Sequence, residues 1–124
     1  MDEVAAQIET LSAVTLTVSE IGRSVRFYES LGFRQRPGHV VPGFASFVLG
    51  GAVPGYLNLL EGEPGPVDGW GRVIVYVSDV DAFYRQALGV GVVPEFAPRD
   101  APWGERYFHL RDPDGHELSF AKPL

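Results

Sequence analysis

One pattern occurs twice along the chain, and this duplication restricts the possible folds more than any other feature. Alternating apolar residues over 13–18 are followed by a Ser-acid pair, an amphipathic stretch and a Leu-Gly pair, and the same order recurs over 72–89. Two copies about 60 residues apart indicate a duplicated module, because a solenoid needs at least three stacked repeats. We therefore expect two copies of one supersecondary unit.

Each copy begins with a strand in which aliphatic residues alternate with mixed ones, the period of a half-buried strand. The aliphatic residues are Val14, Leu16, Val18, Val73, Val75 and Val77. We expect this face to pack against a helix. The opposite, mixed face suits a cavity lining or an interface.

An amphipathic helix is predicted after each strand, and the Leu-Gly pair ends it. Ser19 or Glu20 is the expected N-cap of the first helix, and Ser78 or Asp79 that of the second. The further strands are predicted over 43–49, 56–60, 91–96, 106–110 and 116–121. The segment 112–115, Asp-Pro-Asp-Gly, is interpreted as the turn of the last hairpin.

The length of 124 residues allows one structural domain and is too short for two independent cores. Within it we place a first module over 13–60 and a second over 72–124. The Gly- and Pro-rich segment 61–71 is the predicted linker, and residues 1–12 form an N-terminal extension.

Composition excludes several classes of function. The chain has no cysteine, which rules out disulfides and thiolate metal sites. A net charge of −6 argues against a nucleic-acid partner, and no apolar run is long enough for a membrane span. The acidic first residues lack the features of a signal peptide, so we expect a cytoplasmic protein.

The duplicated βαβββ pattern over roughly residues 11–123, with Leu-Gly-Phe at 31–33 and Asp-Pro-Asp-Gly at 112–115, resembles the vicinal-oxygen-chelate superfamily of glyoxalases, bleomycin-resistance proteins and dioxygenases. Within it, residues 102–115 look most like the metal-free bleomycin-binding resistance proteins, which carry a similar Pro-Trp-Gly stretch and a Leu-Arg-Asp-Pro run. The resemblance implies an α+β fold of two βαβββ modules forming a curved mixed sheet with helices on the outer face. In this family two modules pair to enclose a cavity, often between two chains.

The resemblance also identifies where metal-using members hold their ion. Carried over, those positions are Ala13, Asn58, Arg72 and Ser119. Ala13 has no donor atom, Arg72 is permanently cationic, and the other two are weak neutral donors. Because a catalytic metal needs about three protein ligands, we expect no metal at this place and no cofactor.

Three histidines remain. His39 lies in a Pro- and Gly-rich loop and His116 follows the turn, neither with helical spacing to another ligand. His109 shares a strand face with Tyr107, and a near-neutral pKa makes it a candidate proton acceptor. The alternative is that His109 is a packing residue.

The predicted cavity face carries aromatic and polar side chains, which is typical of a small-molecule site. The predicted ligand-binding residues are Tyr56, Asn58, Arg72, Tyr76, Trp103, Tyr107, His109, Glu117 and Ser119. Aromatic faces stack on planar ligands and also attract cations. Arg72 either pairs with Glu117 or binds an anionic group of a ligand, and Trp103 either covers the cavity or anchors its loop.

Three functions fit these expectations. The first is a homodimeric binding protein that sequesters a planar or cationic compound, such as an antibiotic, without turnover. The second is an enzyme of the same superfamily, a lyase, isomerase or dioxygenase, whose displaced or metal-free site uses His109 with Tyr107 or Glu117. The third is a non-catalytic domain of a pathway or regulatory complex, whose cavity would be filled by side chains. The expected partners are a small molecule and a second copy of the chain, with neither nucleic acid nor membrane.

Overall fold

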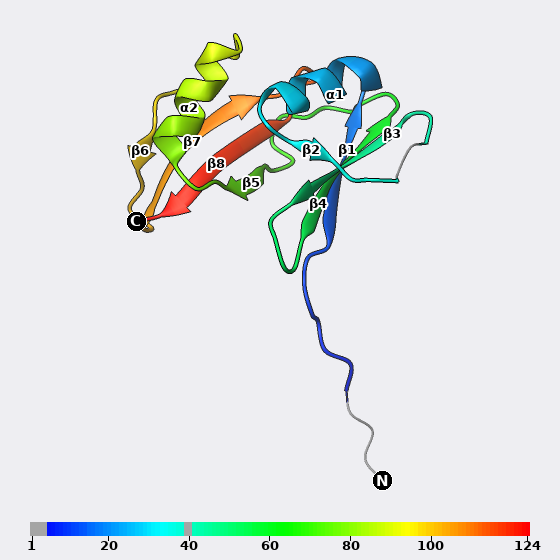
Figure 1. Cartoon of the computed structure of the whole chain (residues 1–124), viewed down its shortest axis with the longest axis horizontal. Helices are drawn as coiled ribbons and strands as arrows, with labels where there is room; N and C mark the ends of the chain where they lie inside the picture. Colours follow the sequence, from blue (N-terminus) through cyan, green and yellow to red (C-terminus); the bar gives the residue numbers. More distant parts are fainter. Residues whose placement is uncertain (1–4, 39–40) are drawn as a thin grey trace.

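The computed structural model describes residues 5–38 and 41–124, and it consists of two modules of the same topology that lie side by side (Figure 1). Each module is a four-stranded sheet with one helix, with strand orders β1-β4-β3-β2 and β5-β8-β7-β6. In both sheets the first strand pairs in parallel with the last strand of its module, and the other pairs are antiparallel. The α+β fold with two βαβββ modules is therefore confirmed.

The elements follow the same order in both halves. The first module contains β1 (Ala13–Val18), α1 (Ile21–Ser30), β2 (Arg34–Gln35), β3 (Phe44–Leu49) and β4 (Gly55–Glu61). The second contains β5 (Val73–Tyr76), α2 (Val80–Gly89), β6 (Arg99–Asp100), β7 (Glu105–Arg111) and β8 (Glu117–Pro123). Neither helix is long and apolar enough to cross a membrane, judged over the described residues.

The helix caps follow the local sequence closely. Of the paired alternatives, the acidic residue is the N-cap each time: Glu20 accepts a hydrogen bond from the backbone of Arg23, and Asp79 from that of Ala82. Gly32 follows α1 with a positive φ of 104°, as expected. After α2 the left-handed residue is Gly91, with a φ of 86°, while Gly89 is still helical.

The strand predicted over 91–96 is wrong. This segment is a turn and loop, and the short strand of this part of the chain is β6, paired with β7. Pro94 has no N–H to donate to a ladder, and Glu95 makes a single backbone hydrogen bond to the carbonyl of His109, at 2.8 Å. The two-residue strand β2 was not predicted, because Arg34 and Gln35 show no apolar alternation.

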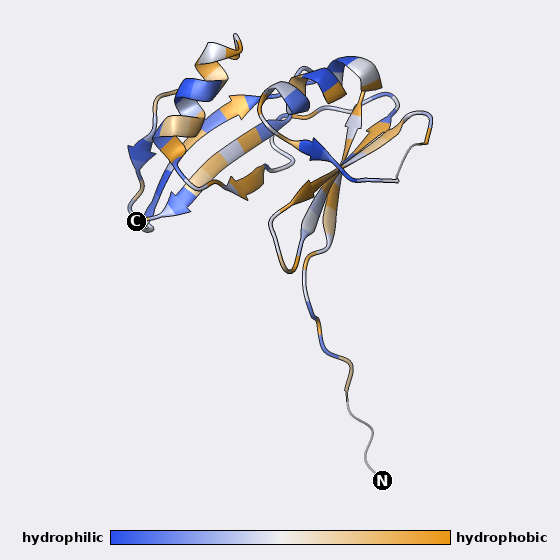
Figure 2. Ribbon diagram, in the orientation of Figure 1, coloured by the Kyte–Doolittle hydropathy of each residue, from blue (hydrophilic) through white to orange (hydrophobic). Residues whose placement is uncertain are grey.

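The main hydrophobic core runs through both modules, and a smaller apolar cluster of Ala101, Tyr107 and Ala121 lies on the second. Alternating residues of each sheet point toward the module's helix, with α1 packed on β3 and β4, and α2 packed on β7 and β8. Phe33 and Phe120 join the two halves by an edge-to-face contact with ring centroids 6.2 Å apart. In Figure 2 apolar stretches alternate with polar ones along both helices and both sheets, as one-sided burial requires.

The turn between β7 and β8 also joins the modules. The Tyr28 hydroxyl of α1 donates a hydrogen bond of 2.8 Å to Asp112, and both residues are buried. Burial and the Asp112 carboxylate raise the pKa of Tyr28 well above its ordinary value of 10, so the hydroxyl stays protonated as a donor. Asp114 accepts hydrogen bonds from the backbone and hydroxyl of Ser19. The Asp-Pro-Asp-Gly motif is thus a turn, as predicted, and its two aspartates also form hydrogen bonds to the first module.

Removing the Tyr28 hydroxyl should destabilise the protein. We expect Tyr28→Phe to lower the free energy of unfolding by about 1–3 kcal/mol, because a buried carboxylate loses one of its donors. Chemical denaturation measures this change. Tyr84→Phe is the matched control, since Tyr84 is a half-buried α2 tyrosine that packs on Phe108 and whose hydroxyl makes no hydrogen bond among the described residues. Equal losses in the two variants would contradict the assigned role.

Candidate functional site

A cavity of about 350 Å³ lies on the face of the second sheet that is turned away from α2. Alternation along the strands produces this face: Phe108 and Phe120 point to the core, whereas Tyr107, His109 and Ser119 point to the cavity. The lining residues are Arg72, Ile74, Arg99, Trp103, Glu105, Tyr107, His109 and Ser119.

One wall of the cavity is aromatic. The rings of Trp103 and Tyr107 lie 5.4 Å apart between centroids, and those of Tyr107 and His109 lie 5.2 Å apart. Trp103 is 65% exposed, and its indole nitrogen donates a hydrogen bond of 2.8 Å to Glu105, which also accepts one from Tyr76. The indole is therefore held in place while much of its surface stays open.

Two guanidinium groups border the same cavity. Arg72 binds Glu117 at 2.9 Å, which is the ion pair that was one of its two predicted roles. Arg99 lies over the Phe96 ring at 3.8 Å and donates to the Tyr107 hydroxyl at 3.1 Å. Burial alone would raise the pKa of Glu117, but the hydrogen bond and charge of Arg72 lower it below its ordinary value.

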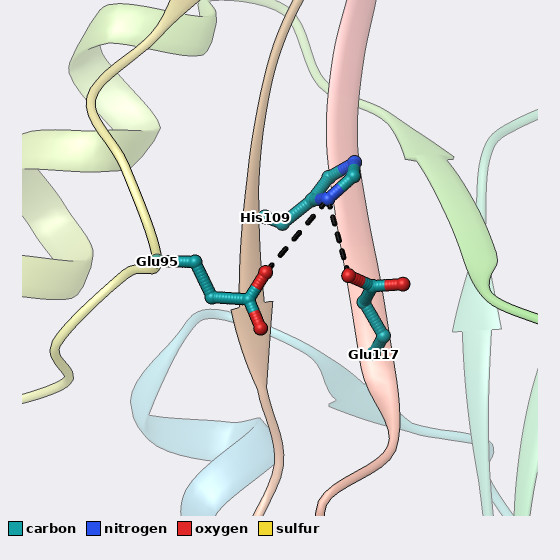
Figure 3. A group of neighbouring side chains, drawn as sticks. All are labelled: Glu95, His109 and Glu117. Carbon is teal, nitrogen blue, oxygen red and sulfur yellow. Dashed lines mark ion pairs between the residues drawn. The ribbon is translucent and has the colours of Figure 1, made fainter. Parts of the chain in front are cut away.

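His109 lies at the junction of this network (Figure 3). Its Nδ1 atom is 3.3 Å from Glu117 and 3.9 Å from Glu95. Burial lowers the pKa of His109 below its ordinary value of 6.5, although the charge of Glu117 opposes this shift. The imidazole is consequently neutral at pH 7.

Sequence reasoning missed Glu95, because it assigned residues 91–96 to a strand. Glu95 reaches His109 from the loop before β6, and Arg111 holds its carboxylate at 2.7 Å. No motif or spacing in the sequence relates these three positions. The pairing of the loop with β7, through the Glu95 amide and the His109 carbonyl, brings them together.

The structure gathers only part of the predicted site. The cavity brings together Arg72, Trp103, Tyr107, His109 and Ser119, with Tyr76 and Glu117 bonded to its lining residues. Tyr56 and Asn58 belong to the first module: Arg36 lies 4.1 Å above the Tyr56 ring, and Asn58 contacts Ser46 and Thr15.

His116 does not line the cavity. His116 is buried with Nε2 2.8 Å from the carbonyl of Thr17, which fits a packing role. With Trp70 and Thr17 it lines a separate pocket of about 200 Å³ between the linker and β1. His39 lies outside the described residues.

The residues at the expected family metal positions do not suit a metal. Ala13 and Asn58 lie on the first module, and Asn58 already accepts from Ser46 at 2.6 Å. Arg72 and Ser119 lie on the second, where Arg72 contributes positive charge. Within residues 5–38 and 41–124, the one group of His, Asp or Glu side chains with converging ligand atoms is Glu95, His109 and Glu117, whose atoms lie within 4.8 Å of one another.

A family model described as the glyoxalase/bleomycin resistance protein/dioxygenase superfamily matches residues 10–120. Among curated proteins, an uncharacterized protein of Mycobacterium bovis is 42% identical over 48 residues, which span 39% of this chain and 32% of that protein. The match therefore spans about a third of the length of this relative.

Solved structures extend the similarity to nearly the whole chain. A glyoxalase/bleomycin resistance protein/dioxygenase from Nocardioides has 26% identity and a TM-score of 0.72, covering 98% of this chain and 87% of its own. TioX from Micromonospora sp. ML1 has 28% identity and a TM-score of 0.70, covering 94% of this chain and 100% of its own.

The charges around His109 predict opposite effects for two variants. Glu117→Gln should lower the pKa of His109 further, because the Glu117 charge raises it, whereas Arg72→Met should raise it. NMR titration of the imidazole signals, with a chelator present to remove trace metals, measures both shifts. His116 is the internal control, and a shift of the same sign in both variants would contradict this electrostatic account.

Proposed function

The chain belongs to the glyoxalase/bleomycin resistance protein/dioxygenase superfamily, and we propose that it is a small-molecule binding protein that sequesters a planar compound without turnover. The observation that carries the proposal is the aromatic wall of the second-module cavity, formed by Trp103 and Tyr107. An antibiotic with a fused aromatic ring system is the first class of compound to test.

The cavity suits such a ligand in its volume and in the fixed position of its Trp103 side chain. Its volume of about 350 Å³ is near the lower end of the range for small-molecule sites, about 300–1,000 Å³. Stacking on an indole contributes about 0.5–1.5 kcal/mol beyond the burial of apolar area. Because Glu105 already holds the Trp103 ring, little side-chain entropy is lost when a ligand covers it.

The charges of the cavity leave planar ligands of either charge open. Arg72 is neutralised by Glu117, whereas Arg99 bonds to an uncharged hydroxyl. Glu105 lines the same cavity, and its carboxylate accepts from the uncharged Trp103 and Tyr76 side chains. Arg99 can attract carboxylate or carbonyl oxygens and Glu105 can attract a cation, so a planar ligand of either charge fits the proposal.

We also propose that the binding form is a homodimer. In one chain the cavity face leaves Ile74 59%, Tyr76 62% and Trp103 65% exposed, an arrangement typical of an interface or a ligand site. A second copy that covers this face with its first module would bring Tyr56 and Asn58 to the cavity. All the predicted ligand-binding residues would then line one site.

An enzyme of the same superfamily is the second candidate. One observation favours it: the neutral imidazole of His109 lies in the cavity wall beside Glu117, where it can accept a proton from a bound ligand. The two candidates differ in the fate of the ligand, which leaves a binding protein unchanged.

Replacing the indole should weaken binding of planar compounds. A thermal-shift screen with nalidixic acid (a planar acid), ethidium (a planar cation) and bleomycin ranks the ligand types, because binding to the native state raises the melting temperature. Comparing the planar acid with the planar cation shows whether Arg99 or Glu105 determines the preferred charge of the ligand. By calorimetry, Trp103→Ala should reduce the affinity for the best ligand by about tenfold or more, the equivalent of about 1.4 kcal/mol.

Trp70→Ala is the matched control, because Trp70 borders a different pocket. Equal weakening in both variants, or no melting shift with any of the three compounds, would overturn the sequestration proposal. Mass spectrometry of the recovered ligand separates the two proposed functions. A chemically altered ligand would mean that the protein is an enzyme and not a binding protein.

The dimer makes a separate prediction. Light scattering should give twice the mass of one chain, and Ile74→Glu should shift the protein to monomers because it places a charge in a desolvated interface. Val93→Glu is the control, since Val93 is 84% exposed on the loop after α2. A monomeric wild-type protein at micromolar concentration would refute the dimer.

A further inference from the structure

The cluster of Glu95, His109 and Glu117 has a chemistry that sequestration of a planar ligand does not use. We propose that these three side chains form a binding site for a divalent transition-metal ion of the Zn²⁺ type, displaced from the positions where metal-using relatives hold theirs. This inference goes beyond the proposed binding function and does not depend on it.

The spacing of the donor atoms fits a metal centre. His109 Nδ1 lies 3.3 Å from Glu117 Oε1 and 3.9 Å from Glu95 Oε2 (Figure 3). Zinc bonds of about 2.0–2.2 Å in a tetrahedron place neighbouring ligand atoms roughly 3.3–3.6 Å apart. Both distances are longer than an ordinary charged hydrogen bond, which is about 2.7–2.9 Å. The separation of His109 and Glu117 therefore matches two ligands of one ion, whereas that of His109 and Glu95 is a few tenths of an ångström too long, so Glu95 would move inward on binding.

Arginines orient both carboxylates. Glu95 binds Arg111 through Oε1, at 2.7 Å, and Glu117 binds Arg72 through Oε2, at 2.9 Å. Each glutamate thus turns its other oxygen toward His109. Metal-ligating carboxylates are characteristically held by such outer hydrogen bonds, which set their orientation before the ion binds.

The backbone places the three residues on a rigid frame. Register between β7 and β8 puts Arg111 opposite Glu117 and His109 opposite Ser119, so His109 and Glu117 are diagonal neighbours on one sheet face. Glu95 is tied to β7 by its amide, which donates to the His109 carbonyl at 2.8 Å. A site built in this way needs little rearrangement to bind an ion.

His109 would bind the ion through Nδ1, the ring atom that faces both glutamates, in the tautomer that carries its proton on Nε2. The neighbouring arginines lower the affinity of the site for a metal ion. Arg72 and Arg111 offset the charge of the two glutamates, which should make the affinity lower than that of a closed four-ligand site.

The ligand set favours zinc-like ions over magnesium or calcium. One imidazole and two carboxylates are a mixed nitrogen and oxygen set, which suits Zn²⁺ and Co²⁺, whereas Mg²⁺ and Ca²⁺ prefer oxygen ligands alone. Three protein ligands leave a coordination position for water or for a donor atom of another molecule. His109 also lines the aromatic cavity, so the ion would lie at its wall.

The test is titration of the chelator-treated, dialysed protein with ZnCl₂ by calorimetry and with CoCl₂ by visible absorption at pH 7.5. We expect one ion per chain and the intense d–d bands of low-coordinate cobalt. His109→Ala, Glu117→Gln and Glu95→Gln should each weaken Zn²⁺ binding at least tenfold. Glu95→Gln is the safest variant for folding, because Glu95 is an exposed loop residue. Circular dichroism checks that each variant is folded.

Glu105→Gln is the matched control, since Glu105 lines the same cavity outside the cluster and should leave zinc affinity unchanged. No saturable binding up to millimolar Zn²⁺, or binding that survives both Glu95→Gln and His109→Ala, would overturn the site. Trp103→Ala separates this inference from the proposed function: it should bind Zn²⁺ like wild type while losing the planar ligand. If zinc binding were lost in Trp103→Ala together with the planar ligand, the cluster would not be an independent metal site.

Discussion

The buried hydrogen bond between Tyr28 and Asp112 is the interaction on which the arrangement of the two modules depends. It joins α1 of the first module to the β7–β8 turn of the second, and Asp112 also accepts from the backbone of Asp114 and His116. Each module is too small to bury a core alone. The shared core and the hydrogen bond between Tyr28 and Asp112 therefore stabilise the two modules together. The position of β7 and β8, and hence of the cavity residues they carry, follows from it.

One-sided packing of both sheets is what makes a site available. Each helix covers one sheet face, and the opposite face of the second sheet keeps Trp103, Tyr76 and Ile74 open to solvent. The polar side chains of that face are held by one another, as in the bond from Trp103 to Glu105. The face is therefore ordered before any ligand arrives, which reduces the entropy lost on binding.

The arginines of this face have different partners. Arg99 lies over the Phe96 ring beside the aromatic wall, whereas Arg72 and Arg111 neutralise and orient the carboxylates near His109. A planar ligand and a metal ion would then use neighbouring but separate groups. His109 belongs to both, because its ring lines the cavity and its Nδ1 faces the two glutamates.

Local patterns were sufficient to predict much of the fold. The duplication, the two capped helices, the last hairpin and the shared face of Arg72, Tyr107, His109 and Ser119 follow from periodicity and short-range propensity. The structure decided for Glu20 and Asp79 over the neighbouring serines as caps, and it placed Trp103 in the cavity lining. The strand predicted over 91–96 is absent because Pro94 cannot donate to a ladder. Glu95 was therefore not predicted as a residue of the site.

Only the tertiary structure decided that Tyr28 meets Asp112, 84 positions away, and that Glu95 meets His109 and Glu117. Periodicity determines which face of an element a residue occupies, because that depends on neighbouring backbone angles. Which faces then meet depends on packing and charge pairing among residues distant in sequence, which no local pattern encodes.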